Sequence, residues 1–310
     1  MLFSKLQSAI RRGNASSSRS ASPQRYAGRS GGAKPAAASG QTSAHWHQIA
    51  GQWDQLGPPL RPSAEDTGAY EEAIRRWGCS TALRGLILGV TPELYHLPWP
   101  AGSHITAVDR TERMIELVWP GARRDAICAD WTEMPLEAES RDIALCDAGI
   151  VLLSYPDGHE QLVRELARIL SPGGLCVLRL CVLPEIPEAP QAVLDDLVGG
   201  RIPNLNILKL RLAMAMQERP EQGVPLNQIW DELHHRAPDL GQLAAHIGWS
   251  YQHLAAINTY RHCPNRYSFL TLAEVCQLFC ESPGGFWCES VYRPSYALGE
   301  RCPIVVFRRN

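Results

Sequence analysis

The chain has 310 residues, of which 45% are apolar and 20% are charged, so its composition predicts a packed globular core. Its formal net charge of −2 hides an asymmetry, because seven Lys or Arg residues but no acids precede Asp54. The acidic remainder argues against a nucleic-acid-binding surface, which needs clustered basic residues. The sequence contains no apolar run of about 18 residues or more, so no membrane-spanning helix is predicted.

The first 44 residues are rich in Ser, Ala, Gly and Arg and are predicted to form a disordered basic tail or a targeting segment. Leu2, Phe3, Leu6 and Ile10 fall near one helical face beside basic residues, a composition that also suits an organellar transit peptide. Two interpretations stay open. The chain is either a cytoplasmic protein with a disordered tail, or a mitochondrial or plastid protein with a transit peptide.

The ten cysteines are spread singly along the chain, with no C-x-x-C pair, which predicts free thiols in a reducing compartment. Cys276 and Cys280 are four residues apart on an expected helix, and Cys263 follows His262. These spacings are not those of a typical zinc site, so no metal is predicted.

From residue 83 onward, short apolar runs alternate with amphipathic stretches, which predicts a parallel sheet covered by helices. We expect strands at residues 83–89, 104–109, 125–130, 142–147 and 175–183. Helices are expected at 112–118 and 159–170, and the S-P-G-G turn at 171–174 should end the second. Three of the first four strands end on an acid, Asp109, Asp130 and Asp147, at the sheet edge where open α/β sheets bind ligands. Asp is also common in turns, which is the alternative explanation.

The order of these segments resembles that of the class I S-adenosylmethionine (SAM) dependent methyltransferases. The resemblance lies in G-V-T-P-E-L after the first strand, A-V-D-R-T-E-R-M-I at the second, A-D-W after the third, and E-L-A-R-I-L-S-P-G-G-L-C-V-L-R before and within the fifth. It implies a three-layer, doubly wound, mostly parallel sheet with a C-terminal antiparallel hairpin, a SAM-binding core at 81–183, and SAM as the cofactor. The first loop is a variant, because only Gly89 remains of the family's usual three or so glycines.

Carried over position by position, the resemblance implies a set of cofactor-binding residues: Gly89, Thr91, Glu93, Asp109, Arg110, Met114, Asp130, Trp131 and Asp147. Asp109 would accept hydrogen bonds from both ribose hydroxyls, and Asp130 would accept one from the adenine amino group. Thr91 is expected to cap the helix that Pro92 begins. Met114 and Trp131 would pack on the adenine, although both also fit ordinary core packing.

Two segments flank this core. Residues 45–80 are expected to form an N-terminal lid and a helix at 67–77, with Trp53 and Arg61 over the crevice. The alternative is a connector that its tryptophans, including Trp46, anchor to the sheet. Residues 184–266 are expected to form a helical insertion, with helices at 192–198, 207–218, 227–236 and 240–247. In this family such additions commonly build the acceptor pocket, and the candidate lining residues are Tyr251, His253, Tyr260, Arg261, His262 and Tyr267. The alternative is a helical cap with surface histidines.

Residues 267–310 are expected to complete the core with a helix at 268–279 and strands at 286–292 and 302–307, the last strand lying at the sheet edge. The resemblance implies methyl transfer from SAM to an acceptor, which we expect to be a small molecule. A base is needed only if the acceptor loses a proton, and Asp147, His159 and His262 are the candidates. Because C-D-A-G-I-V-L replaces D/N-P-P-Y/F after the fourth strand, methylation of a nucleic-acid amino group is disfavoured.

Alternative functions remain open at this point. The chain could be a catalytically inactive, methyltransferase-like binding or assembly protein. The reason to consider this alternative is the variant loop at Gly89. It could also methylate a protein or a nucleic acid, or transfer an aminopropyl group on the same fold.

Overall fold

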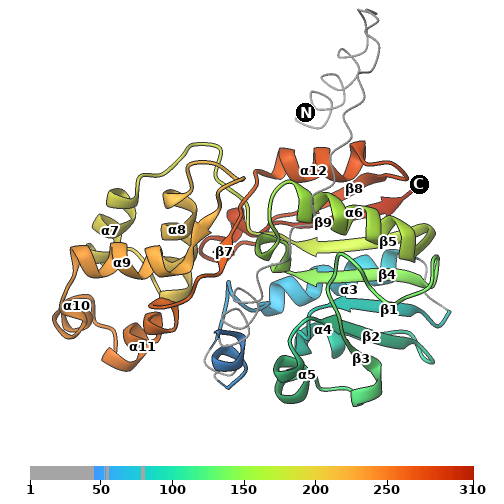
Figure 1. Ribbon diagram of the computed structural model, residues 1–310, viewed down its shortest axis with the longest axis horizontal. Helices are drawn as coiled ribbons and strands as arrows, with labels where there is room; N and C mark the ends of the chain where they lie inside the picture. Colours follow the sequence, from blue (N-terminus) through green and yellow to red (C-terminus); the bar gives the residue numbers. More distant parts are fainter. Residues whose placement is uncertain (1–44, 52, 54–55, 78–80) are drawn as a thin grey trace, which may run out of the picture. The chain divides into compact units, whose positions relative to one another are not determined.

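The computed structural model describes residues 45–51, 53, 56–77 and 81–310 (Figure 1). The predicted tail or targeting segment at 1–44 lies outside the described residues. The expected α/β architecture is present as a seven-stranded sheet in the order β3-β2-β1-β4-β5-β9-β8. Its strands are β1 (Arg84–Leu88), β2 (His104–Asp109), β3 (Ala126–Cys128), β4 (Arg141–Asp147), β5 (Leu170–Arg179), β8 (Phe286–Tyr292) and β9 (Ile304–Arg309).

The first five strands are parallel, and β9 is antiparallel to both β5 and β8. This arrangement confirms the mostly parallel sheet and the C-terminal hairpin. The prediction that the last strand lies at the edge was wrong, because β9 lies between β5 and β8. The reason is burial: Ile304, Val305, Val306 and Phe307 are all buried, as suits an inner strand covered on both faces, whereas Trp287 on β8 is 46% exposed.

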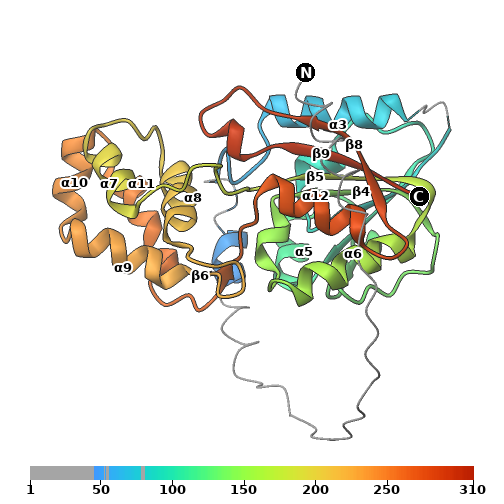
Figure 2. The same ribbon diagram turned by 90° about the horizontal axis from the view of Figure 1, so that it is seen from above.

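Alternate residues of the strands face two different helical layers, as the two-residue period of a strand requires. On one face, residues such as Ile87, Leu145 and Val177 form a core with α3 (Ala64–Arg76), α4 (Pro92–Tyr95) and α5 (Glu112–Val118). On the other face, residues such as Leu86 and Cys146 pack against α6 (Asp157–Ile169) and α12 (Leu272–Glu281). Figure 2 shows α3 on one side of the sheet and α6 and α12 on the other.

Two helices begin at capping boxes that shift them from the predicted ranges. In α3 the Ser63 side chain accepts from the amide of Asp66, whose carboxylate accepts from the Ser63 amide. Thr271 and Glu274 make the same reciprocal pair at the start of α12. The first helix therefore starts three residues earlier than predicted, and the second starts four residues later.

The insertion after β5 contains the four predicted helices, α7 (Pro190–Val198), α8 (Leu205–Met216), α9 (Leu226–Arg236) and α10 (Leu240–Ile247). It also contains α11 (Tyr251–Ala255) and a two-stranded sheet of β6 (Val224–Pro225) and β7 (Arg266–Tyr267), which were not predicted. The helices α7–α11 share their own hydrophobic core and lie beyond the carboxyl ends of β4 and β5 (Figures 1 and 2). The insertion therefore stands next to the edge of the sheet at which ligands bind in open α/β folds.

The nine cysteines in the described part of the chain are free thiols. Within the same residues, no helix is both long and apolar enough to cross a membrane.

Candidate functional site

A cleft opens where β1, β2 and β4 end, between the sheet, the described part of the segment from 45 to 60 (45–51, 53 and 56–60) and the insertion. Twelve of the residues singled out from the sequence line it: Trp46, Trp53, Gly89, Thr91, Asp109, Arg110, Met114, Asp130, Trp131, Asp147, Tyr260 and Tyr267. Residues far apart in the sequence therefore converge on one concave surface, as expected of a ligand site in this class of fold.

Several other candidates lie elsewhere. His159 is buried in α6, where its Nδ1 lies 3.2 Å from the Ser154 carbonyl oxygen, and burial lowers its pKa. The exposed Arg261 stacks its guanidinium 5.1 Å from the centre of the Trp230 ring. The predicted lining residues Tyr251, His253 and His262 are exposed and do not line the cleft. His159 and His262 are thus not placed to take a proton from a ligand in this cleft.

Gly89 and Asp109 form the centre of the cleft floor. Gly89 follows β1 with φ +91°, a conformation that favours glycine, and its amide donates to the Val108 carbonyl at 2.8 Å. A Cβ atom at position 89 would lie 4.0 Å from Asp109 Oδ2 and 3.7 Å from Trp131 Cζ2. The missing side chain therefore leaves open space between the carboxylate and the indole.

Asp109 ends β2 and turns its carboxylate into this space. Oδ1 accepts a 2.7 Å hydrogen bond from the Thr111 amide, which fixes the rotamer. Burial raises the pKa of Asp109 to about 6, and the Thr111 amide, the charge of Arg110 and the Thr111 side chain oppose that rise. The cleft thus holds a partly desolvated carboxylate, whose Oδ2 lies beside the space that Gly89 leaves open.

Asp130 and Trp131 form the wall of the cleft after β3. Asp130 Oδ1 accepts from the Thr132 amide at 2.9 Å and from its hydroxyl at 2.7 Å, which orients the carboxylate. The Trp131 indole donates to the Val108 carbonyl at 2.6 Å. Its ring packs on Gly149, where an added Cβ would lie only 2.6 Å from Cη2. Gly149, in the C-D-A-G segment after β4, therefore sets the position of this indole and was not recognised in the sequence.

Thr91 lines the cleft, but the prediction that its side chain caps the next helix was wrong. It occupies the N-cap position of α4 without making a capping hydrogen bond, and Pro92 occupies the first turn as predicted.

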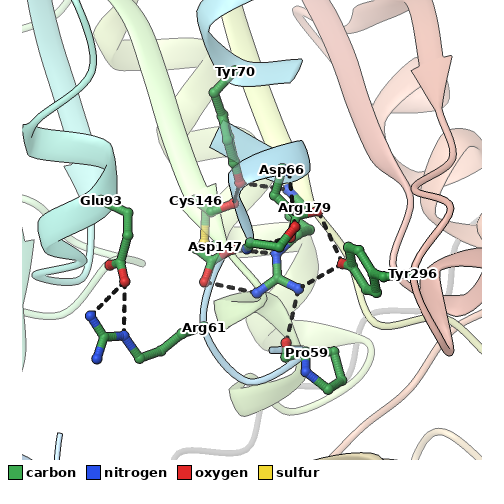
Figure 3. A network of polar contacts seen from close by, with 10 residues as sticks. Pro59, Arg61, Asp66, Tyr70, Glu93, Cys146, Asp147, Arg179 and Tyr296 are labelled. Atoms are coloured by element: carbon green, nitrogen blue, oxygen red, sulfur yellow. Dashed lines mark hydrogen bonds and ion pairs between the residues drawn. The ribbon is translucent and has the colours of Figure 1, made fainter. Parts of the chain in front are cut away.

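Asp147 ends β4 and is bound by the fully buried Arg179 of β5 (Figure 3). The guanidinium donates to the two carboxylate oxygens, from Nε at 2.5 Å and from Nη2 at 3.0 Å. Burial opposes the charge of Arg179, but the attraction of Asp147 outweighs it and raises the pKa of Arg179 well above its ordinary value. Asp147 is therefore half of an ion pair, which makes it a poor candidate for a proton-accepting base.

The remaining donors of Arg179 tie this pair to the N-terminal segment. Nη1 donates to the Pro59 carbonyl at 2.8 Å and contacts Tyr296 Oη at 3.4 Å. The hydroxyl of the fully buried Tyr70 donates to the Cys146 carbonyl at 2.8 Å and accepts from the Arg179 amide at 3.0 Å (Figure 3). Strands β4 and β5 and the segment before α3 are thereby joined at the cleft.

Arg61 and Glu93 fasten residues 45–61 to the first loop, beside the cleft rather than in its lining. Arg61 Nη2 lies 2.6 Å from Glu93 Oε1, and Nη1 donates to the Trp53 carbonyl at 3.1 Å (Figure 3). The guanidinium also stacks 5.2 Å from the centre of the Trp53 ring. Since His45, Trp53 and Leu60 line the cleft, this segment contributes one of its walls.

Two basic residues of the cleft, His45 and Lys209, were also missed in the sequence. His45 is buried, its Nδ1 has no hydrogen-bond partner within the described residues, and burial lowers its pKa to about 4. Lys209 on α8 is 3% exposed, and its Nζ lies 4.7 Å from the centre of the Tyr260 ring. The available signal was that Lys209 is the only lysine after Lys34 and that it interrupts the apolar run L-N-I-L-K-L.

The comparison with known families agrees with this geometry. Residues 86–178, from β1 to β5, match a family model described as a methyltransferase domain. Residues 86–178 therefore match a methyltransferase domain, and the sheet has the fold of the class I methyltransferases. No curated protein matches the chain in sequence.

Solved structures share the fold of this chain at low sequence identity. One, described as a putative zinc-dependent alcohol dehydrogenase from Rhodobacter sphaeroides, is 14% identical with a TM-score of 0.58, over 87% of this chain and 99% of that chain. The 1,6-didemethyltoxoflavin-N1-methyltransferase of Burkholderia thailandensis is 12% identical with a TM-score of 0.51, over 91% and 93%. The CcbJ methyltransferase of Streptomyces caelestis is 15% identical with a TM-score of 0.50, over 87% and 98%. These likenesses show the fold.

Proposed function

We propose that this chain is a SAM-dependent methyltransferase that acts on a small-molecule acceptor. The observation that carries the proposal is the Asp109 carboxylate at the end of β2, with Oδ2 facing the space that Gly89 leaves open. A carboxylate so placed suits the two hydroxyls of a ribose, which it can recognise by charge-assisted hydrogen bonds. The methyltransferase family match across the same strands supports this choice of nucleoside cofactor.

The neighbouring side chains fit the rest of an adenosine. Asp130 has one oxygen occupied by Thr132 and presents the other to an exocyclic amino group. Trp131, held by Val108 and Gly149, and Met114 offer apolar surface to a purine ring. Thr91 and Gly89 then lie toward the methionine portion.

The acceptor is assigned to the part of the cleft between residues 45–60 and the insertion. Its lining is largely apolar and aromatic, with Trp53, Leu56, Leu60 and Tyr260 among the residues. Such a lining suits a small molecule, which binds in concave, mostly apolar pockets with few polar groups. The Burkholderia thailandensis structure was determined with bound 1,6-didemethyltoxoflavin and S-adenosylhomocysteine, and that precedent supports a small-molecule acceptor on this fold.

SAM, when bound, supplies an electrophilic methyl group on a sulfonium, and transfer is an in-line displacement. The chain's part is to hold the acceptor nucleophile in line and to exclude water, through the wall that residues 45–60 contribute. If the acceptor must lose a proton, His45 is the group placed to accept it. Burial keeps its imidazole neutral at pH 7, and its Nδ1 lacks a partner within the described residues.

The test is calorimetric titration of the full chain with SAM and S-adenosylhomocysteine. We expect binding with a Kd in the micromolar range. Mass spectrometry of an incubation with candidate small molecules should then find products heavier by one methyl group. Transfer of an aminopropyl group would refute methylation, and a folded protein that binds neither ligand would favour a binding or assembly role.

The ion pair between Arg61 and Glu93 gives a further prediction. Arg61→Ala should raise the dissociation rate of S-adenosylhomocysteine about fivefold, because a partly buried pair with a cation–π contact contributes about 1 kcal/mol. Stopped-flow tryptophan fluorescence measures this rate. Arg75→Ala is the matched control, since Arg75 makes an exposed pair with Glu72 in α3. Equal rates for Arg61→Ala and the wild type would show that residues 45–61 are an anchor and not a lid.

A further inference from the structure

Lys209 is a buried cation in a part of the cleft that the cofactor does not use. It lies on α8, where the residues before and after it, Leu208 and Leu210, are also buried. It lines the cleft together with Tyr260 and His45, and it also borders an adjoining hollow with Asn206 and His253. Lys209 is therefore a lining residue of the pocket assigned to the acceptor.

No carboxylate of the described residues pairs with Lys209. Its helix neighbour Arg211 bonds to Glu188 and Asp196, and Arg179, which is equally buried, is bound by Asp147. By contrast, within the described residues the Lys209 ammonium has the face of the Tyr260 ring, at 4.7 Å, and no ion pair. A buried charge without an ionic partner is costly, and burial lowers the pKa of Lys209 to about 8.

We propose that the acceptor carries an anionic group, a carboxylate, which binds Lys209 while its flat apolar body lies against Tyr260 and Trp53. The inference rests on the proposed function, and it names the class of acceptor. Lysine suits this role because its compact ammonium meets a single anionic group. The cleft then holds two separate recognition elements, Asp109 for the nucleoside and Lys209 for the acceptor.

The test compares isosteric probes that differ in charge: benzoate with benzamide, and 2-naphthoate with 2-naphthamide. Their affinities are measured by calorimetry, with and without saturating S-adenosylhomocysteine. We expect the carboxylate of at least one pair to bind the wild type about tenfold more tightly than its amide. Equal affinities within both pairs, or no binding of any probe, would overturn the inference. The affinity of S-adenosylhomocysteine itself reports separately on the proposed function.

Lys209→Met keeps the length of the side chain and removes its charge, so it should reduce the preference for the carboxylate to about twofold or less. Lys209→Arg should keep part of that preference. Arg211→Met is the matched control on the same helix and should leave the probes unaffected. The melting temperature verifies folding, and Lys209→Met should raise it by about 3 °C, because an unpaired buried charge is lost. A preference for the carboxylate that survives in Lys209→Met would refute the role of Lys209.

The pH dependence of probe binding gives a second readout. Carboxylate binding should weaken as the pH rises above about 8, where free Lys209 loses its proton, while amide binding stays constant. Three titratable groups of the cleft near Lys209 do not change charge there: burial lowers the pKa of His45 to about 4, raises that of Tyr267 to about 12 and raises that of Tyr260. The Cys181 thiol, whose pKa a hydrogen bond from Cys302 lowers, is removed from the readout by repeating the titration in Cys181→Ala. Constant carboxylate binding from pH 7 to 10 would contradict the inference.

Discussion

Asp109→Ala is expected to weaken the binding of SAM and of S-adenosylhomocysteine about a hundredfold or more. The proposed contact is a pair of charge-assisted hydrogen bonds to the ribose, each contributing about 1.5 to 3 kcal/mol, and alanine removes both. The Thr111 amide donates to Asp109 Oδ1 at 2.7 Å and holds the carboxylate in one orientation before the ligand binds. Binding to the wild type therefore costs little side-chain conformational entropy. Calorimetric titration of both ligands measures the effect.

Two further variants make this experiment specific. Asp109→Asn keeps the shape of the side chain and one acceptor oxygen but loses the charge. Its affinity for SAM and S-adenosylhomocysteine should therefore lie between those of the wild type and Asp109→Ala. Asp125→Asn changes an acid just before β3 that does not line the cleft, and it should bind like the wild type. If Asp109→Ala bound S-adenosylhomocysteine within threefold of the wild type, the ribose assignment would be refuted.

The raised pKa of Asp109 also predicts a pH dependence. Ribose hydroxyls favour the ionised carboxylate, so cofactor affinity should rise with pH up to about 6 and level off above it. For stability the sign is opposite: the folded pKa lies above the unfolded value of 3.8, so the buried charge costs stability as the pH rises from about 4 to 6. Asp109→Asn should therefore be more stable than the wild type by about 1 to 2 kcal/mol at pH 7, and by little at pH 4. Thermal unfolding at the two pH values tests this difference.

The strands and helices of the core could be predicted because their sequence pattern is local. The run from His104 to Asp109 and the helix from Glu112 to Val118 appear in the structure with the predicted bounds. The position of β9 inside the sheet could not be derived in the same way, because strand order depends on pairing between distant segments. The two-residue strands β6 and β7 were missed for the same reason, since a ladder that short has no period to detect.

The cleft residues likewise fall into those that a local sequence pattern predicts and those that depend on tertiary packing. Asp109, Asp130 and Asp147 were predictable because they follow strand ends, where the topology of the sheet gathers side chains. The sequence did not reveal that Asp147 is neutralised, because its partner Arg179 is 32 residues away on another strand. Lys209 and His45 come from segments whose approach to the sheet depends on tertiary packing. An isolated lysine in an apolar helix was the one local sign of a buried charge.

Arg179→Met is expected to lower the free energy of unfolding by about 3 to 5 kcal/mol. The substitution leaves the Asp147 carboxylate, 4% exposed, without its partner in a buried site, and a charge so placed is far costlier than the pair. It also removes the donor to the Pro59 carbonyl, which joins β5 to the segment before α3. Urea denaturation, with the midpoint and slope both fitted, measures the loss.

A double-mutant cycle with Asp147→Leu distinguishes the net contribution of the Asp147–Arg179 ion pair to the free energy of unfolding from the cost of leaving one charge buried without a partner. The double variant Asp147→Leu/Arg179→Met contains no buried charge at this position, so it should recover at least about 2 kcal/mol relative to Arg179→Met alone. Arg84→Met is the matched control: it breaks a pair with Asp142 in which the arginine side chain is 50% exposed, and it should cost about 1 kcal/mol or less. If Arg179→Met cost no more than this control, the pair would not be what joins β4 and β5 at the cleft. The positions of Asp109 and Gly89 in the cleft floor would then be stabilised by the apolar packing on the two faces of the sheet alone.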